Sequence, residues 1–419
     1  MHLIWCGART ARRWSRRWTA RGSFFYAQTP GASPQEFYRE GYDVSGWDEI
    51  AVPGYIQLQA AGSTVRPHYV NTQYPWDGHE RLEPPAVPER YNPVGCYVRG
   101  FAVPQSWDGP VCVRFDGVET AFAVWCNGVF IGYSEDSFTP AEFDLTPAVH
   151  RDGENRLAVR VYRFSSASWL EDQDFFRFSG IFRDVFLYAK PRFHVEDVWA
   201  RAGLTEDYGT GVFSLDMKIS GGETGERDFK LEWILSDRDG KRTAGGSAEE
   251  HDLRGHVFAE IPGVRPWSSG DPYLYRLLLT LRDSGGNVVE MIPMDIGFRR
   301  FEIKDKIMLL NGERIIINGV NRHEWNPRTG RAITGEDMRK DIEILKRSHI
   351  NAVRTSHYPN QSLWYRLCDE NGIYVMDEAN LESHGSWQKM GQCEPSWNVP
   401  GSLPEWEDCV VDRAVSMLE

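Results

Sequence analysis

Hydrophobic and polar residues alternate along much of the chain before residue 300. Between about residues 95 and 189, apolar side chains recur at every second position, as at Val111, Val113 and Phe115, with more polar residues between them. A period of two is typical of half-buried β-strands. Asn127-Gly128 lies between two such segments and is the dipeptide that most strongly predicts a hairpin turn. The pattern predicts a β-sandwich or jelly roll.

A second alternating region occupies about residues 192 to 300. Its apolar residues again share one face of each segment and are Phe213, Leu215, Met217 and Ile219, then Phe229, Leu231, Trp233 and Leu235. A run of about a hundred residues with this pattern predicts an immunoglobulin-like sandwich. Lys190-Pro191 is the predicted joint between the two sandwiches.

The spacing of apolar residues along the chain changes after Asn311-Gly312. Apolar strands are predicted at 314–320, 350–355 and 373–376, and helices between them, which gives the order β-α-β-α-β. Thr334 opens the first helix, with Asp337 three residues later as in a capping box. Asn371-Gly372 ends the second. This order predicts the start of a parallel α/β fold.

The same region is short for a complete barrel. A (β/α)₈ barrel needs on the order of 250 residues, whereas Arg314 to Glu419 spans 106 residues. A last helix, predicted from Trp406 to Met417, runs to the final residue without a cap or a following strand. The sequence therefore predicts less than half a barrel and a chain that is cut within it.

Charge and cysteine usage narrow the function. The 47 Lys+Arg and 60 Asp+Glu residues give a net charge of -13, which disfavours binding to nucleic acid. The sequence has no apolar run of the roughly 18 residues that a membrane span needs. Seven scattered cysteines and the lack of an apolar leader segment favour a reducing cytoplasm.

Polar residues concentrate where the three predicted parallel strands end. The groups are Asn321, Arg322, His323 and Glu324, then Arg354, Ser356 and His357, then Asp377, Glu378, Asn380, Glu382 and His384. The carboxyl ends of barrel strands build the active site in this architecture. A single histidine there is most simply a structural hydrogen-bonding group, but recurrence at three successive strand ends predicts an enzyme.

Glu382 and His384 are separated by one residue on a predicted extended loop. Alternate residues of an extended chain point to the same side, so both side chains could ligate one divalent ion. Two ligands do not complete a site, so spacing alone leaves metal binding and a purely structural role both open.

Five segments resemble the signatures of family 2 β-galactosidases, in the order in which that family has them. They are Asn71-Thr72-Gln73-Tyr74-Pro75, Glu171-Asp172-Gln173-Asp174 with Ser179-Gly180-Ile181-Phe182-Arg183-Asp184, Asn318-Gly319-Val320-Asn321-Arg322-His323-Glu324, Arg354-Thr355-Ser356-His357-Tyr358-Pro359-Asn360, and Asp377-Glu378-Ala379-Asn380-Leu381-Glu382-Ser383-His384-Gly385. The resemblance covers about residue 25 to the end. It implies a jelly-roll sugar-binding domain at 25–190, an immunoglobulin-like β-sandwich at 191–300 and the first part of a TIM barrel at 301–419.

The resemblance also implies roles for individual residues. His323 and His357 match the histidines that hydrogen-bond galactose and stabilise its transition state. Asn71, Asp174 and Arg354 match residues of the substrate-binding site. Glu382 and His384 match two ligands of Mg²⁺, and Asp174 also matches a ligand of Na⁺. The implied substrate is a β-galactoside such as lactose, and the implied full-length form is a homo-oligomer.

Two departures from the family pattern accompany this resemblance. Retaining enzymes of this kind need an acid/base Glu and a nucleophile Glu about 5 Å apart. The resemblance places both on later barrel strands, so we expect this chain alone to be inactive. The Arg-rich residues 1–24 also replace the strand expected at the start, which suggests a misread frame or an altered start.

Three functions therefore compete. The first is retaining hydrolysis of terminal β-D-galactosides. The second is another family 2 activity such as that of β-glucuronidases, which share variants of the Asn-Arg-His and Ser-His-Tyr-Pro segments, although the Glu-x-His-Gly ending favours galactosidase. The third is a non-catalytic carbohydrate-binding fragment.

Overall fold

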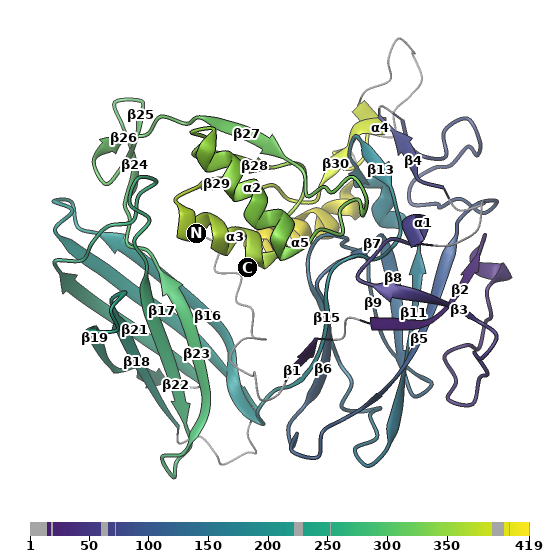
Figure 1. The fold of residues 1–419 in the computed structure, drawn as a ribbon, viewed down its shortest axis with the longest axis horizontal. Coiled ribbons are helices and arrows are strands. Elements are labelled where there is room, and N and C mark those ends of the chain that lie inside the picture. Colours follow the sequence, from purple (N-terminus) through teal and green to yellow (C-terminus); the bar gives the residue numbers. More distant parts are fainter. Residues whose placement is uncertain are drawn as a thin grey trace.

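The computed structural model describes residues 15–17, 20–59, 66–71, 73–221, 229–251, 253–387, 398–401 and 403–418. They form three units in chain order, with the second at the left of Figure 1, the first at the right and the third between them at the top. The first 14 residues of the Arg-rich start lie outside the described residues. β1 (Ser15–Arg17) and β2 (Ala20–Ala27) join the sheets of the first unit, so the last part of the Arg-rich start is folded with that unit.

The first unit is a sandwich of two antiparallel sheets. The smaller contains, in spatial order, β1, β15 (Val185–Ala189), β6 (Val111–Phe115) and β10 (Ala141–Asp144). The larger contains β3 (Asp48–Val52), β2, β5 (Val94–Ala102), β11 (Glu154–Tyr162), β8 (Ala121–Cys126) and β9 (Val129–Ser134). The hairpin predicted at Asn127-Gly128 is confirmed, since both residues have positive φ between β8 and β9.

One expectation about this sandwich is wrong. The residues between the apolar positions of β6 were expected to be half exposed, yet Cys112 and Arg114 are buried as well. The strand is central in its sheet, and Arg114 is paired with Asp116 at 2.8 Å, so its charge is compensated below the surface.

Short elements of the same unit face the third unit. They are η2 (Pro30–Ala32), α1 (Ile56–Gln59), β4 (His68–Val70), β7 (Val118–Glu119), η3 (Ser166–Trp169), β12 (Glu171–Asp172), β13 (Phe175–Arg177) and β14 (Gly180–Ile181). β4 pairs with β13 and β7 with β14, both antiparallel. These pairs carry residues of the candidate site described below.

The second unit is the predicted immunoglobulin-like sandwich. Its sheets are β16 (Phe193–Leu204), β17 (Thr210–Gly221), β21 (Arg254–Pro262) and β20 (Glu249–His251), facing β19 (Arg242–Ser247), β18 (Lys230–Ser236), β22 (Tyr275–Arg282) and β23 (Val288–Ile296). The alternating residues on β17 and β18 point into one core, where Phe213, Leu215 and Leu235 are fully buried. Period-two patterning therefore located this core correctly.

The third unit begins with a small meander and continues as a parallel sheet. The meander is β24 (Phe301–Lys304), β25 (Ile307–Leu310) and β26 (Glu313–Arg314). β27 (Gly319–Arg322), β28 (Ala352–Thr355) and β29 (Tyr374–Met376) then pair in parallel, with α2 (Gly335–Arg347) and α3 (Ser362–Asn371) between them. The order β-α-β-α-β is confirmed. The first strand was expected at 314–320 but begins at Gly319, and residues 315–318 form no strand.

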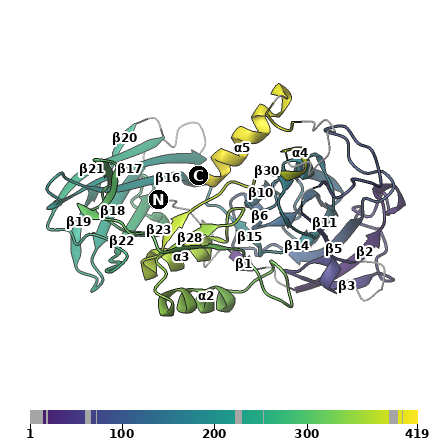
Figure 2. The same cartoon turned by 90° about the horizontal axis from the view of Figure 1, so that it is seen from above.

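Helix signals in this unit are confirmed. The Thr334 side chain accepts from the Asp337 backbone, and the Asp337 carboxylate accepts from Thr334 N, which completes the predicted capping box. Gly372, with φ of 72°, ends α3. β30 (Glu382–Ser383), α4 (His384–Trp387), η4 (Pro404–Trp406) and α5 (Glu407–Leu418) follow. Figure 2 shows α2 and α3 on one side of the parallel strands and α5 on the other.

Buried ion pairs join the first and third units. Arg183 Nη2 lies 2.9 Å from Glu324 Oε2, and Arg331 Nη2 lies 2.8 Å from Glu119 Oε2. All four side chains are at least 97% buried. A buried ion pair costs desolvation, and removing one partner typically destabilises a protein by about 3–5 kcal/mol. These pairs therefore fix the first unit against the third.

We expect limited proteolysis to trim residues 314–419 before it cuts residues 25–300. The two sandwiches have complete apolar cores, whereas the third unit exposes Ile316 and Ile317 ahead of β27 and Met376 in β29 to solvent. Exposed apolar residues of this kind mark segments that open readily. Mass spectrometry of the fragments would identify the order of cleavage. Loss of the sandwiches with retention of 314–419 would contradict this prediction.

Two further observations concern membrane-spanning helices and the state of the cysteines. No helix in the described part of the chain is long and apolar enough to cross a bilayer. Among the described residues, Cys96, Cys112, Cys126, Cys368 and Cys409 are free thiols.

Candidate active site

The three parallel strands bring their polar ends to one edge of the sheet. β27 is paired in register with β28, so that Asn321 is opposite Arg354 and Arg322 is opposite Thr355. The residues that follow these strands, His323 and His357, meet edge to face with ring centroids 5.4 Å apart. The strand-end cluster expected from the sequence therefore exists as a spatial cluster.

Glu378 organises the outer part of this cluster. Its Oε1 accepts a hydrogen bond from Arg354 Nη2 at 2.9 Å and lies 3.0 Å from Nδ1 of His357, and its Oε2 forms an ion pair with Arg354 Nε at 2.8 Å. Because Glu378 engages Nδ1, Nε2 is the ring atom of His357 left for a ligand. The sequence assigned no role to Glu378, although its position at a strand end was the available signal.

His323 is uncharged at neutral pH. Desolvation, reinforced by the neighbouring His357 and Arg331, lowers the pKa of His323 to about 4. Its Nδ1 lies 3.3 Å from the hydroxyl of Tyr358. A neutral imidazole at this point can hydrogen-bond a hydroxyl group without placing a positive charge beside it.

The first unit supplies the facing wall. A pocket of about 540 Å³ is lined by side chains of both units, among them Tyr69, Asp174, Phe176, His323, Trp325 and Arg331. Asp174 accepts a hydrogen bond from the Tyr69 hydroxyl. Phe175 is paired with Val70, and this antiparallel register brings Asn71 beside Asp174. Asp174 and His323 therefore face the same space, although 149 positions separate them in the sequence.

Aromatic rings form one side of the pocket. Phe176 and Trp325 are stacked with centroids 5.5 Å apart and planes 16° from parallel, and both rings are partly exposed. Partly exposed flat rings beside a carboxylate and imidazoles can pack against the C–H face of a sugar while the polar groups bind its hydroxyls. The arrangement suits a neutral, polyhydroxylated ligand.

Glu382 and His384 lie together in a second part of the site. Glu382 Oε1 is 3.9 Å from His384 Nδ1. Burial raises the pKa of the Glu382 carboxyl, and the nearby His357 and His384 oppose this shift. A carboxylate and an imidazole are suitable donors for a divalent ion. Among the described residues, however, no group of three or more His, Cys, Asp or Glu side chains could hold a metal.

The structure thus gathers the residues singled out from the sequence into two neighbouring groups. Asp174 and His323 line the pocket, Asn71 follows the end of β4 next to Asp174, and His357 contacts His323 at the pocket edge. Arg354 reaches His357 through Glu378. Glu382 and His384 form the second group. The metal roles assigned to Glu382, His384 and Asp174 stay predictions.

Models of known protein families match the chain in three consecutive parts. Residues 18–191 match "Glycosyl hydrolases family 2, sugar binding domain", residues 193–299 match "Glycosyl hydrolases family 2", and residues 301–419 match "Glycosyl hydrolases family 2, TIM barrel domain". The three matches follow the three structural units.

Curated proteins show much closer similarity. The chain is 54% identical to a β-galactosidase of Halalkalibacterium halodurans and 52% identical to one of Clostridium acetobutylicum, in each case over 94% of this chain. It spans 39% and 43% of the lengths of those proteins. It is also 47% identical to a β-galactosidase large subunit of Latilactobacillus sakei and spans 64% of that subunit.

Solved structures share the fold at lower identity. A Bifidobacterium dentium β-glucuronidase in complex with coumarin-3-O-glucuronide has a TM-score of 0.73 at 23% identity, covering 88% of this chain and 61% of that one. A Bacteroides vulgatus β-glycosidase has a TM-score of 0.73 at 21% identity, covering 96% and 48%. Similarity at this identity shows the fold alone.

Proposed function

Because the chain belongs to glycosyl hydrolases family 2, we propose that it provides the galactose-binding part of a retaining β-galactosidase. The pocket that Asp174 and His323 share supports this proposal most directly, since it joins the sugar-binding domain to the barrel strand ends. The proposed substrates are β-galactosides with a terminal non-reducing galactose, such as lactose. Three relatives of more than 50% identity are β-galactosidases by name.

In this proposal, each group of the site acts on a different part of the sugar. Asp174 and Asn71 bind ring hydroxyls from the sugar-binding domain, and His323 donates or accepts as a neutral imidazole. His357, held by Glu378 through Nδ1, presents Nε2 to the sugar. Groups that accept hydrogen bonds from the sugar hydroxyls stabilise an oxocarbenium-like transition state, because those hydroxyls become stronger donors as positive charge develops on the ring. The acid/base and nucleophile carboxylates would come from later barrel strands.

The alternatives differ in what the site binds. β-Glucuronidases are among the fold neighbours, at 19–23% identity, and a glucuronide carries an additional carboxylate that needs a cationic partner. Three arginines lie near the strand ends, and each is already paired with a carboxylate: Arg354 with Glu378, Arg322 with Asp341 and Arg331 with Glu119. This pairing favours a neutral galactoside over a glucuronide. A non-catalytic sugar-binding role would need only the pocket.

The proposal can be tested with residues 1–419 continued by the remainder of the Halalkalibacterium halodurans relative, referred to below as the extended chain. We expect it to hydrolyse 4-nitrophenyl β-D-galactoside and to leave the matching β-D-glucuronide intact. Preference for the glucuronide would refute the proposal. Calorimetry of residues 1–419 with galactose tests the third alternative, because a binding module would bind galactose in the absence of any turnover.

We further propose that Glu382 and His384 are two of the ligands of a Mg²⁺ ion and that Asp174 is a ligand of Na⁺. A Mg²⁺ ion would contribute positive charge beside the sugar site. The carboxylate and imidazole pair 3.9 Å apart supports the first assignment. The proposed protein is a cytoplasmic homo-oligomer in its full-length form.

Chelation of the metal is expected to lower kcat of the extended chain by about tenfold or more, and added Mg²⁺ to restore it. Glu382→Gln removes one anionic ligand and is expected to raise the Mg²⁺ concentration for half-maximal activity by about 10–100-fold. Glu343→Gln, on the exposed face of α2, is the matched control. Identical Mg²⁺ dependence in Glu382→Gln and wild type would contradict the ligand assignment.

A further inference from the structure

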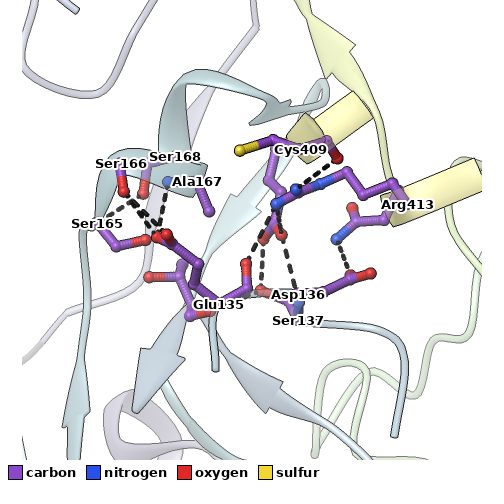
Figure 3. A network of polar contacts seen from close by, with 12 residues as sticks. Glu135, Asp136, Ser137, Ser165, Ser166, Ala167, Ser168, Cys409 and Arg413 are labelled. Atoms are coloured by element: carbon purple, nitrogen blue, oxygen red, sulfur yellow. Dashed lines mark hydrogen bonds and ion pairs between the residues drawn. The ribbon is translucent and has the colours of Figure 1, made fainter. Parts of the chain in front are cut away.

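Arg413 fastens helix α5 to the sugar-binding domain. Its Nη2 donates to Glu171 Oε1 at 3.0 Å and to the backbone oxygen of Glu135 at 3.2 Å, while Nη1 donates to Cys409 O within its own helix at 3.3 Å (Figure 3). The side chain is 96% buried. An arginine buried to this degree is retained only where fixed acceptors compensate its desolvation.

Glu171 is the charged acceptor on the sugar-binding side, and it is bound from two further directions. Its carboxylate accepts from Ser137 N at 3.3 Å and from Ser137 Oγ at 2.5 Å. Its backbone belongs to β12, which pairs in parallel with β30 so that Glu171 is opposite Glu382. Glu382 N donates to Leu170 O at 2.6 Å in the same ladder. One residue therefore touches both α5 and the loop that carries Glu382.

The next residues of the same segment reach the other strand ends. Gln173, which is fully buried, donates through Nε2 to Asn380 Oδ1 at 2.9 Å and to His357 O at 3.3 Å. Asn380 in turn donates to Asp136 Oδ1 at 3.0 Å. The loop 377–384 is thus held to the sugar-binding domain by side-chain hydrogen bonds at Asn380 and by the backbone ladder at Glu382.

We propose that Glu171, Gln173 and Arg413 form a domain clamp, through which the sugar-binding domain positions loop 377–384 and His357 for catalysis. These are positioning residues, since they act through Glu382, Asn380 and the His357 backbone. The catalytic part of this inference rests on the proposed β-galactosidase function. The mechanical part concerns residues 1–419 alone and can be tested without any activity.

The chemistry of the clamp explains why it can position its neighbours rather than only stabilise them. Hydrogen bonds to charged partners in a dry interior are strong and directional, so a clamp of this kind has one favoured geometry. Burial raises the pKa of Glu171, and the Arg413 guanidinium opposes that shift because it stabilises the carboxylate. Removal of Arg413 would leave an uncompensated buried carboxyl group directly beneath the β12–β30 ladder.

Hydrogen–deuterium exchange of residues 1–419 tests the mechanical part. Arg413→Met keeps the length of the side chain and removes its charge, and it is expected to accelerate exchange in peptides covering 135–137 and 377–384 by about tenfold or more. Peptides of the second unit should be unchanged. Arg201→Met breaks an exposed ion pair with Asp216 in that unit and is the control. Exchange at 377–384 equal to that of wild type would overturn the clamp.

Kinetics of the extended chain test the catalytic part. Arg413→Met is expected to lower kcat by about tenfold or more while KM changes by less than about threefold, because the hydroxyl-binding groups of the pocket are left in place. Arg413→Lys should recover part of the lost kcat. The double variant Glu171→Gln with Arg413→Met should have a kcat no lower than that of the less active single variant, since both substitutions remove the same contact.

The exchange experiment and the kinetic experiment together distinguish a failure of the clamp from a failure of the proposed function. An extended chain without galactosidase activity would refute the proposed function, while exchange at 377–384 would still decide whether the clamp exists. Faster exchange with unchanged kcat would show that the clamp is structural only and would overturn its positioning role. A parallel rise in KM with unchanged kcat would likewise overturn it, because the loss would then lie in substrate binding.

Discussion

Purified residues 1–419 are expected to release no measurable aglycone from aryl β-galactosides, with or without Mg²⁺. Cleaving the glycosidic bond with retention needs two carboxyl groups about 5 Å apart. One donates a proton to the leaving oxygen, and the other is the nucleophile. General acid catalysis alone contributes about 10²–10⁴-fold. Because we propose that both groups come from later barrel strands, turnover of residues 1–419 should lie at least about 10⁴-fold below that of the extended chain.

The carboxylates at the strand ends of this chain are committed to other partners. Glu324 is buried against Arg183, and Glu378 holds Arg354 and His357. Asp377 accepts hydrogen bonds from Thr355 and Tyr365. A carboxylate held in this way by cations and hydroxyls is not positioned to attack the sugar or to protonate the leaving oxygen.

The assay needs protein from a strain that lacks its own β-galactosidase, since traces of the host enzyme would mimic activity. The extended chain under the same conditions is the positive control. Turnover by residues 1–419 in that background would overturn the assignment of the acid/base and nucleophile to later strands, and with it the main prediction made from the sequence.

His357→Ala in the extended chain is expected to lower kcat by about 10²–10³-fold with little change in thermal stability. The imidazole lies at the strand end beside His323, with its Nδ1 held at 3.0 Å by Glu378. Its hydrogen bond to the sugar should strengthen as positive charge develops on the ring. Replacing it removes a contact that matters most in the transition state, so kcat should fall more than KM rises.

A histidine outside the site provides the control for this experiment. His256 lies on the exposed face of the second unit, where its Nδ1 is 2.7 Å from the carboxylate of Asp216. His256→Ala should leave both kcat and KM unchanged. Turnover of His357→Ala near that of wild type would assign His357 a structural role.

Local patterns in the sequence predicted the elements well because each depends on neighbours along the chain. The Asn127-Gly128 turn requires only positive φ at two adjacent residues, and the Thr334–Asp337 capping box needs only one helical turn. The first barrel strand was placed too early because residues 315–317 are all isoleucine and match a buried strand by composition, yet they form no strand.

The partners of buried charges could not be predicted in the same way. Arg183, Glu119 and Arg331 are residue types that usually lie at the surface, and no periodicity marks them as buried. Their partners lie 141 and 212 positions away. For the same reason the sequence placed Glu378 at a strand end but could not show that it holds His357.

The Arg183–Glu324 and Arg331–Glu119 pairs also bear on how such a protein can change by recombination between genes. Each pair takes one charge from the sugar-binding domain and one from the barrel, and both are enclosed. A crossover between the two coding regions that brings in a partner without the matching charge would leave an ion without compensation in the interior. We therefore expect the boundaries visible along the chain to be poor places for exchange, and these two domains to be inherited as one unit.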